Sequence, residues 1–215
     1  MKIKIRKNYI LYVIIIISIA LLALSGTIMS QVNEPKFKLI ESHNNVEIRE
    51  YTHVIAAQVL VEGERKKAIS VGFRILADYI FGNNIPRQKI SMTSPVTQQQ
   101  GEKIAMTGPV TQQELEEGKQ WKVRFIMPSE YMLKTLPQPN DSRVELLSVP
   151  TKRYVVIRFA GFAGVESLQK HLEKLQKYIS SRKLHTLGGP IFAFYNPPWT
   201  LPFLRRNEIM IELRE

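Results

Sequence analysis

The sequence predicts an α+β fold: an antiparallel, barrel-like sheet of about eight strands flanked by two helices. Most of the chain divides into short runs of alternating apolar and polar residues bounded by turn residues, which indicates strands. Only the segments 65–81 and 165–179 show helical spacing of apolar residues, and each is apolar on one face. Two one-sided helices cannot form a core alone, so they must cover a sheet.

The two predicted helices also match each other. A shift of 99 residues places Ile69 on Leu168 and Phe73 on Leu172, so their apolar faces coincide. Strands precede and follow each helix, although the strands match less well. The sequence therefore predicts two similar halves within one domain, residues 35–215.

In the first half, three strands lead into the first helix. Asparagines at 44 and 45 favour a left-handed turn between the first two strands, and Gly63 ends the third. The helix is closed by Gly82 and two asparagines, which are C-terminal signals. The predicted strands are 37–41, 46–51 and 54–61.

A short duplication follows the first helix. Residues 90–99 recur as 104–113 with alternating apolar and polar side chains, which predicts a hairpin. Each copy carries a proline, Pro95 or Pro109, that cannot donate to a strand ladder, so an edge or a bulge is expected there. The second half has predicted strands at 121–127, 144–149 and 154–160, the helix 165–179, and a last strand around Met210.

Residues 1–30 are predicted to lie outside this fold. Four cations within the first seven residues precede an apolar run, 9–29, that is long enough to cross a bilayer. Positive charge before the run and Glu34 after it place the N-terminus in the cytoplasm and the domain on the non-cytoplasmic side. The alternative is a signal peptide cleaved before Gly26, followed by export.

Composition excludes several classes of site. The chain has no cysteine, which excludes disulfides, thiolate metal sites, iron–sulfur clusters and cysteine nucleophiles. The net charge is +11, and without the N-terminal cations 26 basic residues remain against 19 acidic ones. These charges are dispersed and do not interleave with aromatic residues, so a solvated surface is favoured over nucleic-acid binding.

No dinucleotide-binding, Walker, zincin or serine-hydrolase motif is present, so candidate sites rest on single residues. His171 lies at the rim of the apolar face of the second helix, where an imidazole could bind haem iron axially or hydrogen-bond to a neighbour. His53, at the start of a strand, is a second candidate ligand. Met92 is either core filler or a soft iron ligand.

The last strand carries two acidic residues in one phase. Glu208 and Glu212 alternate with Ile209 and Ile211, the pattern of a half-buried strand. The alternative is a buried Glu208 that acts on a ligand, which would need a raised pKa.

Three stretches in order carry a family resemblance. They are the helix and Gly-Asn turn of 73–83, the motif of 89–96 with its second copy at 103–110, and the segment 194–208, which reads FYNPPWTLPFLRRNE. With these stretches the chain resembles the SOUL haem-binding family over residues 36–215. The resemblance implies a distorted eight-stranded barrel with two flanking helices and pseudo-twofold halves.

The resemblance also implies binding of haem or another tetrapyrrole rather than catalysis. The family's site is a shallow apolar surface beside the first helix, without a dependable axial ligand. Arg74 and the basic residues 65–67 could meet the propionates there. The residues of this chain that the resemblance places in the wall of the tetrapyrrole site are Phe73, Leu76, Ala77, Ile80 and Met92. The alternative role for these apolar residues is core packing against the sheet.

Two other functions stay open at this stage. An effector-binding or hydrolytic domain for another planar apolar molecule would use Glu208 near Trp199. A protein-interaction role would use the proline-stiffened segment 197–202. The alternative for that segment is a loop packed across the barrel through Leu201 and Phe203.

Overall fold

The computed structural model describes residues 12–13, 34–86, 101–115 and 119–214. Met92 and the rest of the first duplicated strand motif lie outside these ranges, as does the predicted membrane segment 9–29 except for Tyr12 and Val13. Within the described ranges, no helix is both long enough and apolar enough to cross a bilayer. The anchor and the cleavable signal peptide therefore stay predictions.

One curled sheet of nine strands dominates the described part of the chain. Its strands are β1 (Phe37–His43), β2 (Val46–Tyr51), β3 (Val54–Glu62), β5 (Val110–Glu114), β6 (Gln120–Ile126), β8 (Glu145–Val149), β9 (Lys152–Phe159), β10 (Thr186–Phe194) and β11 (Asn207–Leu213). Their order across the sheet is β1-β2-β9-β11-β10-β5-β6-β3-β8, and every neighbouring pair is antiparallel. The short strands β4 (Asn84–Ile85) and β7 (Gln138–Pro139) pair separately.

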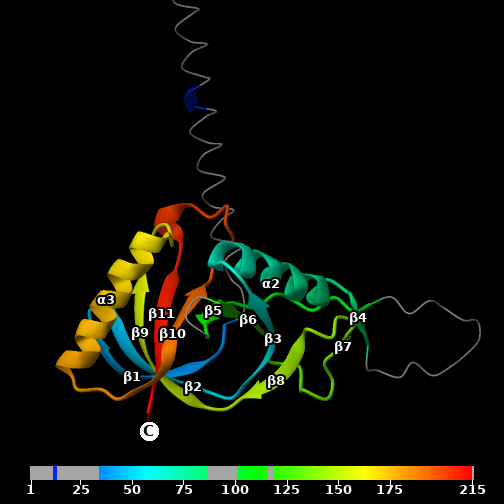
Figure 1. The fold of residues 1–215 in the computed structure, drawn as a ribbon, viewed down its shortest axis with the longest axis horizontal. Helices are drawn as coiled ribbons and strands as arrows, with labels where there is room; N and C mark the ends of the chain where they lie inside the picture. The colour runs from blue at the N-terminus through cyan, green and yellow to red at the C-terminus, as the bar shows by residue number, and fades with distance from the viewer. Residues whose placement is uncertain (1–11, 14–33, 87–100, 116–118, 215) are drawn as a thin grey trace, which may run out of the picture.

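The sheet curls into an open half-barrel (Figure 1). The predicted α+β class and the curled antiparallel sheet are confirmed. The predicted count of about eight strands is wrong, because the main sheet alone has nine. The strand that was not predicted from the sequence is β10, because Gly188 and Pro190 interrupt its alternation of apolar and polar residues. The pairing of β10 with β11 absorbs this interruption as a register shift between Leu187 and Ile191.

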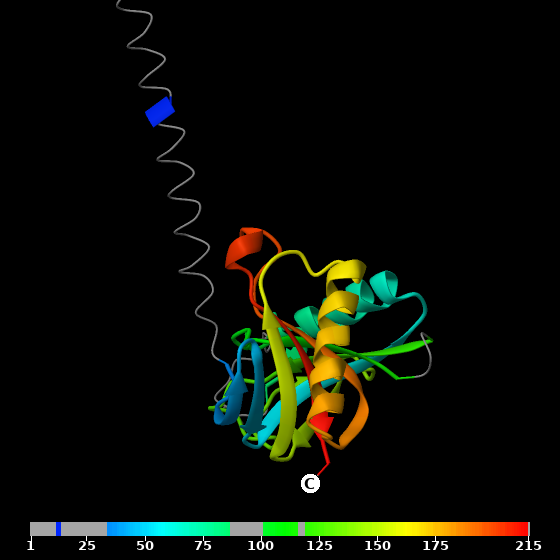
Figure 2. The ribbon, with the colours of Figure 1, turned by 90° about the vertical axis from the view of Figure 1, so that its left-hand side faces the viewer.

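Two helices cover the outer face of the sheet. Helix α2 (Arg65–Ile80) lies on β3 and β6, and α3 (Val165–Ser181) lies on β9 and β11. Figure 2 shows α3 running along the sheet, with α2 on the far side of the molecule. Each half therefore repeats one plan, a helix against a central strand pair, as the 99-residue match of the helices predicts.

Each helix buries its apolar face in a core of its own. Leu76 and Ile80 of α2 are 0% and 1% exposed and meet Val59, Val123 and Phe125 of the sheet. Full burial of such a side chain contributes about 1.5–3 kcal/mol each. The core under α3 is built from Leu168, Leu175, Val155, Ile157, Phe192, Ile209 and Ile211.

A glycine allows α2 to approach the sheet closely. A Cβ atom placed on Gly72 would lie 2.6 Å from Cγ2 of Val123, closer than real Cβ contacts. No larger residue fits there without displacing the helix or the strand.

Candidate functional site

The inner face of the half-barrel, opposite the helices, is polar and aromatic. Strand alternation sends Val155 and Ile157 outward to α3 and turns Tyr154 and Val156 inward. An antiparallel sheet commonly has one face on the core and the other toward solvent. Here the curl of the sheet hollows the second face. Polar or aromatic side chains that face inward include Gln58, Arg49, Tyr51, Thr111, Lys122, Arg124, Lys152, Tyr154, Tyr195, Glu208 and Glu212.

Two adjoining hollows lie on this face and share Pro35, Thr52, Val54 and Ile126. We call the larger one, of about 520 Å³, the groove. We call the smaller one, of about 70 Å³, the inner pocket. Ligand sites in proteins are commonly ~300–1,000 Å³, so the groove can hold a large ligand body and the inner pocket only a small group.

The groove runs along the end of β6 and the loop that follows it. Its apolar walls include Met127, Met132 and Leu133 beside Val54 and Ile126 of the strands. Polar and charged residues, among them Glu34 and Lys36, also line it. Met132 is 65% exposed and Leu133 is 38% exposed, so both can be covered by a ligand.

One histidine lines the groove. The Nε2 atom of His53 lies 2.7 Å from the hydroxyl oxygen of Ser148 on β8. Met127, Tyr131 and Met132 also line the groove, so four of its side chains are of types that can bind a metal held by a ligand. The described ranges contain no group of three or more histidine and carboxylate side chains that could bind a free metal ion.

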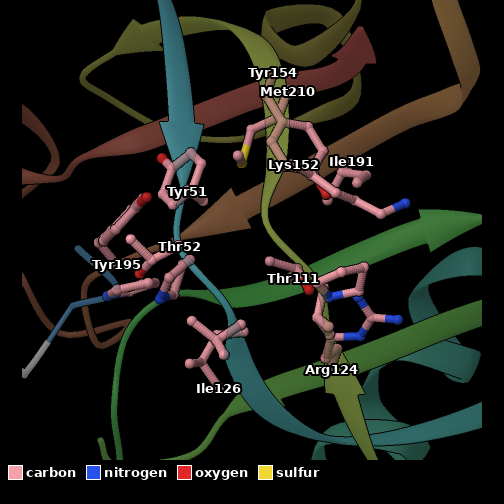
Figure 3. Close-up of a pocket in the computed structure, with 15 residues that line it drawn as sticks. Tyr51, Thr52, Thr111, Arg124, Ile126, Lys152, Tyr154, Ile191, Tyr195 and Met210 are labelled. Atoms are coloured by element: carbon pink, nitrogen blue, oxygen red, sulfur yellow. The ribbon is translucent and has the colours of Figure 1, made fainter. Parts of the chain in front are cut away.

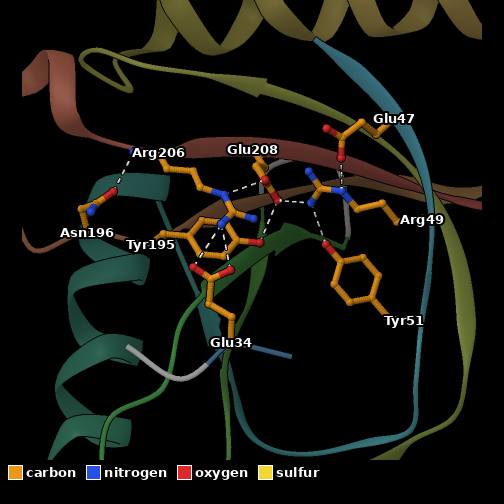
Figure 4. A network of polar contacts seen from close by, with 8 residues as sticks. All are labelled: Glu34, Glu47, Arg49, Tyr51, Tyr195, Asn196, Arg206 and Glu208. Carbon is orange, nitrogen blue, oxygen red and sulfur yellow. Dashed lines mark hydrogen bonds and ion pairs between the residues drawn. The ribbon is translucent and has the colours of Figure 1, made fainter. Parts of the chain in front are cut away.

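A buried ionic network borders the inner pocket (Figure 4). Glu208 is 0% exposed and accepts hydrogen bonds from Arg49 Nη1 at 2.9 Å and from Arg206 Nε at 2.9 Å. The hydroxyl of Tyr195 donates a third bond to Glu208 at 2.7 Å. Arg49 also donates to the hydroxyl of Tyr51 at 2.9 Å, so two tyrosines that line the inner pocket are fixed by this network.

The charges of the network hold Glu208 ionised. Burial alone would raise the pKa of Glu208, but the hydrogen bond and charge of Arg49 and the charge of Arg206 lower it below its usual value. Burial, followed by the charge of Glu208, raises the pKa of Tyr195 well above its usual value. Three donors thus hold a carboxylate whose pKa is lowered, whereas a general base needs a pKa near the working pH.

The N-terminal end of the described domain contacts the buried ionic network at its solvent-exposed edge, through Glu34. Glu34 pairs with Arg206 Nη1 at 2.8 Å, and the guanidinium of Arg206 lies 3.9 Å from the ring centre of Tyr195. The chain therefore enters the domain beside the loop that precedes β11.

The structure divides the residues predicted for a tetrapyrrole site beside α2. Leu76 and Ile80 are enclosed in the core, the alternative role stated for them. Phe73 is 40% exposed and makes an edge contact with Phe125 at 5.3 Å. Arg74 is exposed and Ala77 is half-buried. Neither of the two hollows on the inner face is lined by any of these residues, and a site beside α2 stays a prediction.

His171 lies on the other half of the molecule. Its ring stacks on Phe159 with centres 3.9 Å apart, and its Nδ1 atom lies 2.7 Å from the carbonyl oxygen of Ser167. These contacts fit the hydrogen-bonded alternative for this residue. His171 is not brought together with the α2 residues, and its role as an iron ligand stays a prediction.

The basic residues that line the inner pocket, Arg124 and Lys152, were not predicted as site residues from the sequence. Arg124, which lines the pocket, and the nearby Lys122 alternate in β6 with Trp121 and Val123, a pattern typical of a strand with one solvated face. The curl of the sheet turns that face inward, and pairing brings Thr111 opposite Arg124. The sequence showed only that basic and apolar residues alternate in the centre of this strand. That pattern does not distinguish a basic side chain in a hollow from one in open solvent.

The loop before β11 stands away from the sheet. Trp199 is 67% exposed and Phe203, in the short helix η1 (Pro202–Leu204), is 71% exposed. The expectation that Phe203 packs this loop across the barrel is therefore wrong. Arg205 stiffens the loop by donating to the carbonyl oxygens of Thr200 at 2.7 Å and Pro198 at 2.5 Å.

A curled sheet with a hollow inner face and two outer helices defines a domain suited to binding small molecules. Residues 32–212 match the family model "SOUL heme-binding protein", and the chain belongs to this family. No curated protein matches the chain.

Solved structures with the same fold differ widely in sequence. The C-terminal domain of EcmrR has a TM-score of 0.57 at 11% identity, covering 79% of this chain and 97% of that one. A hydrolase from Listeria innocua has a TM-score of 0.51 at 11% identity, with coverages of 81% and 94%. At such identities the likeness concerns the fold alone.

Proposed function

We propose that this protein binds a tetrapyrrole such as haem in the groove on the inner face of its sheet. The observation that carries the proposal is an apolar groove of about 520 Å³ in a chain of the SOUL family. A tetrapyrrole is a large apolar plate, and its burial against apolar side chains supplies the driving force, about 25 cal/mol for each Å² covered.

The groove offers contacts suited to such a plate. Met132 and Leu133 present exposed apolar surface on one side, and Val54 lies on a strand at the other. His53 is the candidate axial ligand in the groove, because its imidazole needs only to exchange its contact with Ser148 for the iron.

The proposed role is binding without catalysis. The hydrolytic alternative requires Glu208 to accept a proton, yet Arg49, Arg206 and Tyr195 already occupy its carboxylate. We therefore assign Glu208 the role of holding the inner face in shape.

Titration of the full-length protein in nanodiscs with haemin, followed in the Soret band and corrected with empty nanodiscs, tests this proposal. Leu133→Asp places a charge in the groove, and Leu115→Asp is the matched control, because both leucines are 38% exposed. We expect saturable binding that Leu133→Asp weakens about ten-fold or more and Leu115→Asp leaves unchanged. Equal affinity of the two variants would remove the groove as the site.

Two histidine variants test the axial ligand in the same titration. If His53 binds the iron, His53→Ala changes the Soret maximum of the complex and His171→Ala does not. The reverse result would assign the iron to His171 and move the site to α3.

We also propose that the domain rests against a membrane surface through the loop before β11. Trp199 and Phe203 of this loop, and Phe162 of the loop between β9 and α3, are each at least 67% exposed. Tryptophan favours the membrane interface. The nearby pairing of Glu34 with Arg206 brings the start of the domain, just after the predicted membrane segment 9–29, to this loop.

Fluorescence quenching by brominated lipids tests this orientation. The chain has two tryptophans, and Trp121 is only 4% exposed, so Trp199 is the one that lipid can reach. We expect brominated lipid in the nanodisc to quench the full-length protein and to have little effect on Trp199→Phe. Equal quenching of both proteins, or none of either, would contradict the contact.

A further inference from the structure

The inner pocket differs from the groove in size and in chemistry. It is too small for a macrocycle, at about 70 Å³, but it adjoins the groove, with which it shares four lining residues. Figure 3 shows Arg124 and Lys152 on its walls with three tyrosines, Tyr51, Tyr154 and Tyr195. A small polar arm of a ligand seated in the groove can reach this pocket.

Arg124 is a half-buried cation without a carboxylate partner. Its Nε and Nη2 atoms donate to the side-chain oxygen of Gln58 at 3.3 and 2.6 Å, and Gln58 is neutral. In the described ranges no carboxylate lies within ion-pair distance of Arg124, in contrast to Arg49 and Arg206, which both pair with Glu208. A guanidinium has five N–H groups, so donors remain to meet a ligand.

The surroundings of Arg124 are positive on balance. Lys122 and Lys152 are the neighbouring cations, and Lys152 pairs with Glu212 at 2.6 Å. The second carboxylate nearby, Glu145, accepts a bond from Gln58 at 2.7 Å and does not reach the guanidinium.

The pKa values of the two half-buried cations agree with this imbalance. Burial lowers the pKa of Arg124, and the negative charge of Glu145 offsets part of the effect. Burial, followed by the positive charges of Arg124 and Lys152, lowers the pKa of Lys122. An anion in the inner pocket would relieve both effects.

We propose that the inner pocket is a carboxylate site, in which Arg124 binds an acid group carried by the ligand whose apolar body lies in the groove. This inference rests on the proposed function and deepens it: the ligand is a tetrapyrrole with a free carboxylate side chain, not its neutral ester. Arg124 donates to the carboxylate oxygens, and Lys152 adds positive charge at the rim.

Tyr154 complements the site as a neutral donor. Burial and the charge of Glu212 raise the pKa of Tyr154 to about 12, so its hydroxyl keeps its proton at neutral pH. The charge of Glu208 is offset locally, because Arg49 and Arg206 both pair with it directly. The other two carboxylates of the network, Glu47 and Glu34, are partly exposed to solvent, with side chains 24% and 35% accessible.

Paired titrations with protoporphyrin and its dimethyl ester test the site, using the full-length protein in nanodiscs. The variants are Arg124→Gln and the control Arg143→Gln, an arginine on the surface with a side chain 62% exposed. We expect Arg124→Gln to weaken acid binding about 10- to 100-fold, the range of a charge-assisted hydrogen bond, and to leave ester binding unchanged. Arg143→Gln should alter neither.

Equal weakening of acid and ester by Arg124→Gln would indicate a structural role and overturn the proposal, as would no weakening of either. Arg124→Lys keeps the charge and should restore part of the preference for the acid, which separates a lost contact from a damaged fold.

A smaller probe separates this inference from the proposed function. 3-Phenylpropionate should shift the NMR signal of the Arg124 Nε–H group, whereas 3-phenylpropionamide should not. If protoporphyrin and its ester both fail to bind but phenylpropionate shifts this signal, tetrapyrrole binding is refuted and the carboxylate site stands. If the signal does not move either, both proposals fall.

Discussion

Replacing Glu208 by glutamine should destabilise this protein more than any other change of one atom on its inner face. The carboxylate is fully buried and pairs with Arg49 and Arg206, whose side chains are 2% and 18% exposed. The amide keeps the size of the side chain but removes the charge. Arg49 and Arg206 then lose their shared buried counter-charge and keep only the partly exposed carboxylates of Glu47 and Glu34. Breaking a buried ion pair in this way costs about 3–5 kcal/mol.

For a domain of this size, each kcal/mol shifts the melting temperature by about 2–4 °C. Glu208→Gln should therefore lower Tm by roughly 6–20 °C. The matched control is Glu212→Gln on the same strand and face, whose pair with Lys152 is partly exposed, with side chains 23% and 32% accessible. That pair should contribute at most about 1 kcal/mol.

Urea unfolding of the full-length protein, followed by tryptophan fluorescence, measures both variants. A loss for Glu208→Gln no larger than that for Glu212→Gln would refute the view that the network holds the inner face together.

Three further outcomes follow from the same structure. The two arginine partners of Glu208 outweigh its burial and lower its pKa below 4.5. The ionised carboxylate therefore stabilises the folded protein above pH 4.5, and this contribution is lost as the pH falls below it. Glu208→Gln should accordingly flatten the acid limb of a stability–pH curve. In an ultraviolet pH titration of the tyrosines, the step near pH 12 should become smaller in Tyr154→Phe but not disappear, because the pKa values of Tyr154 and Tyr131 are both raised to about 12. Gly72→Ala should cost about 1–3 kcal/mol through its clash with Val123. The control Gly189→Ala, whose Cβ would meet its nearest neighbour at 3.9 Å, should stay within about 0.5 kcal/mol in urea unfolding.

The sequence predicted the parts of the fold that depend on local periodicity. Helix α2 was expected over 65–81 and spans Arg65–Ile80, and α3 was expected over 165–179 and spans Val165–Ser181. The turn at Asn44 also has the expected left-handed backbone, with φ of 54°. These features depend on residues close in sequence, so a single chain reveals them.

The inner face could not be predicted in the same way, because it depends on pairing between distant strands. Glu208 and Arg49 are 159 positions apart, and only the order β2-β9-β11 brings them together. The curl of the sheet turns Arg124 into a hollow, although its strand has the pattern of a solvated surface. Alternation in a strand shows which side chains share a face, but not whether that face is flat or concave.

Paramagnetic broadening by haemin would locate the ligand most directly. With methyl-labelled full-length protein, the iron should broaden the signals of Met132 and Leu133 in the groove. Val71 on α2, which is exposed to the same degree as Leu133 at 38%, should keep its signal. Broadening of Val71 with sharp signals from Met132 and Leu133 would contradict the proposed groove and place the tetrapyrrole beside α2.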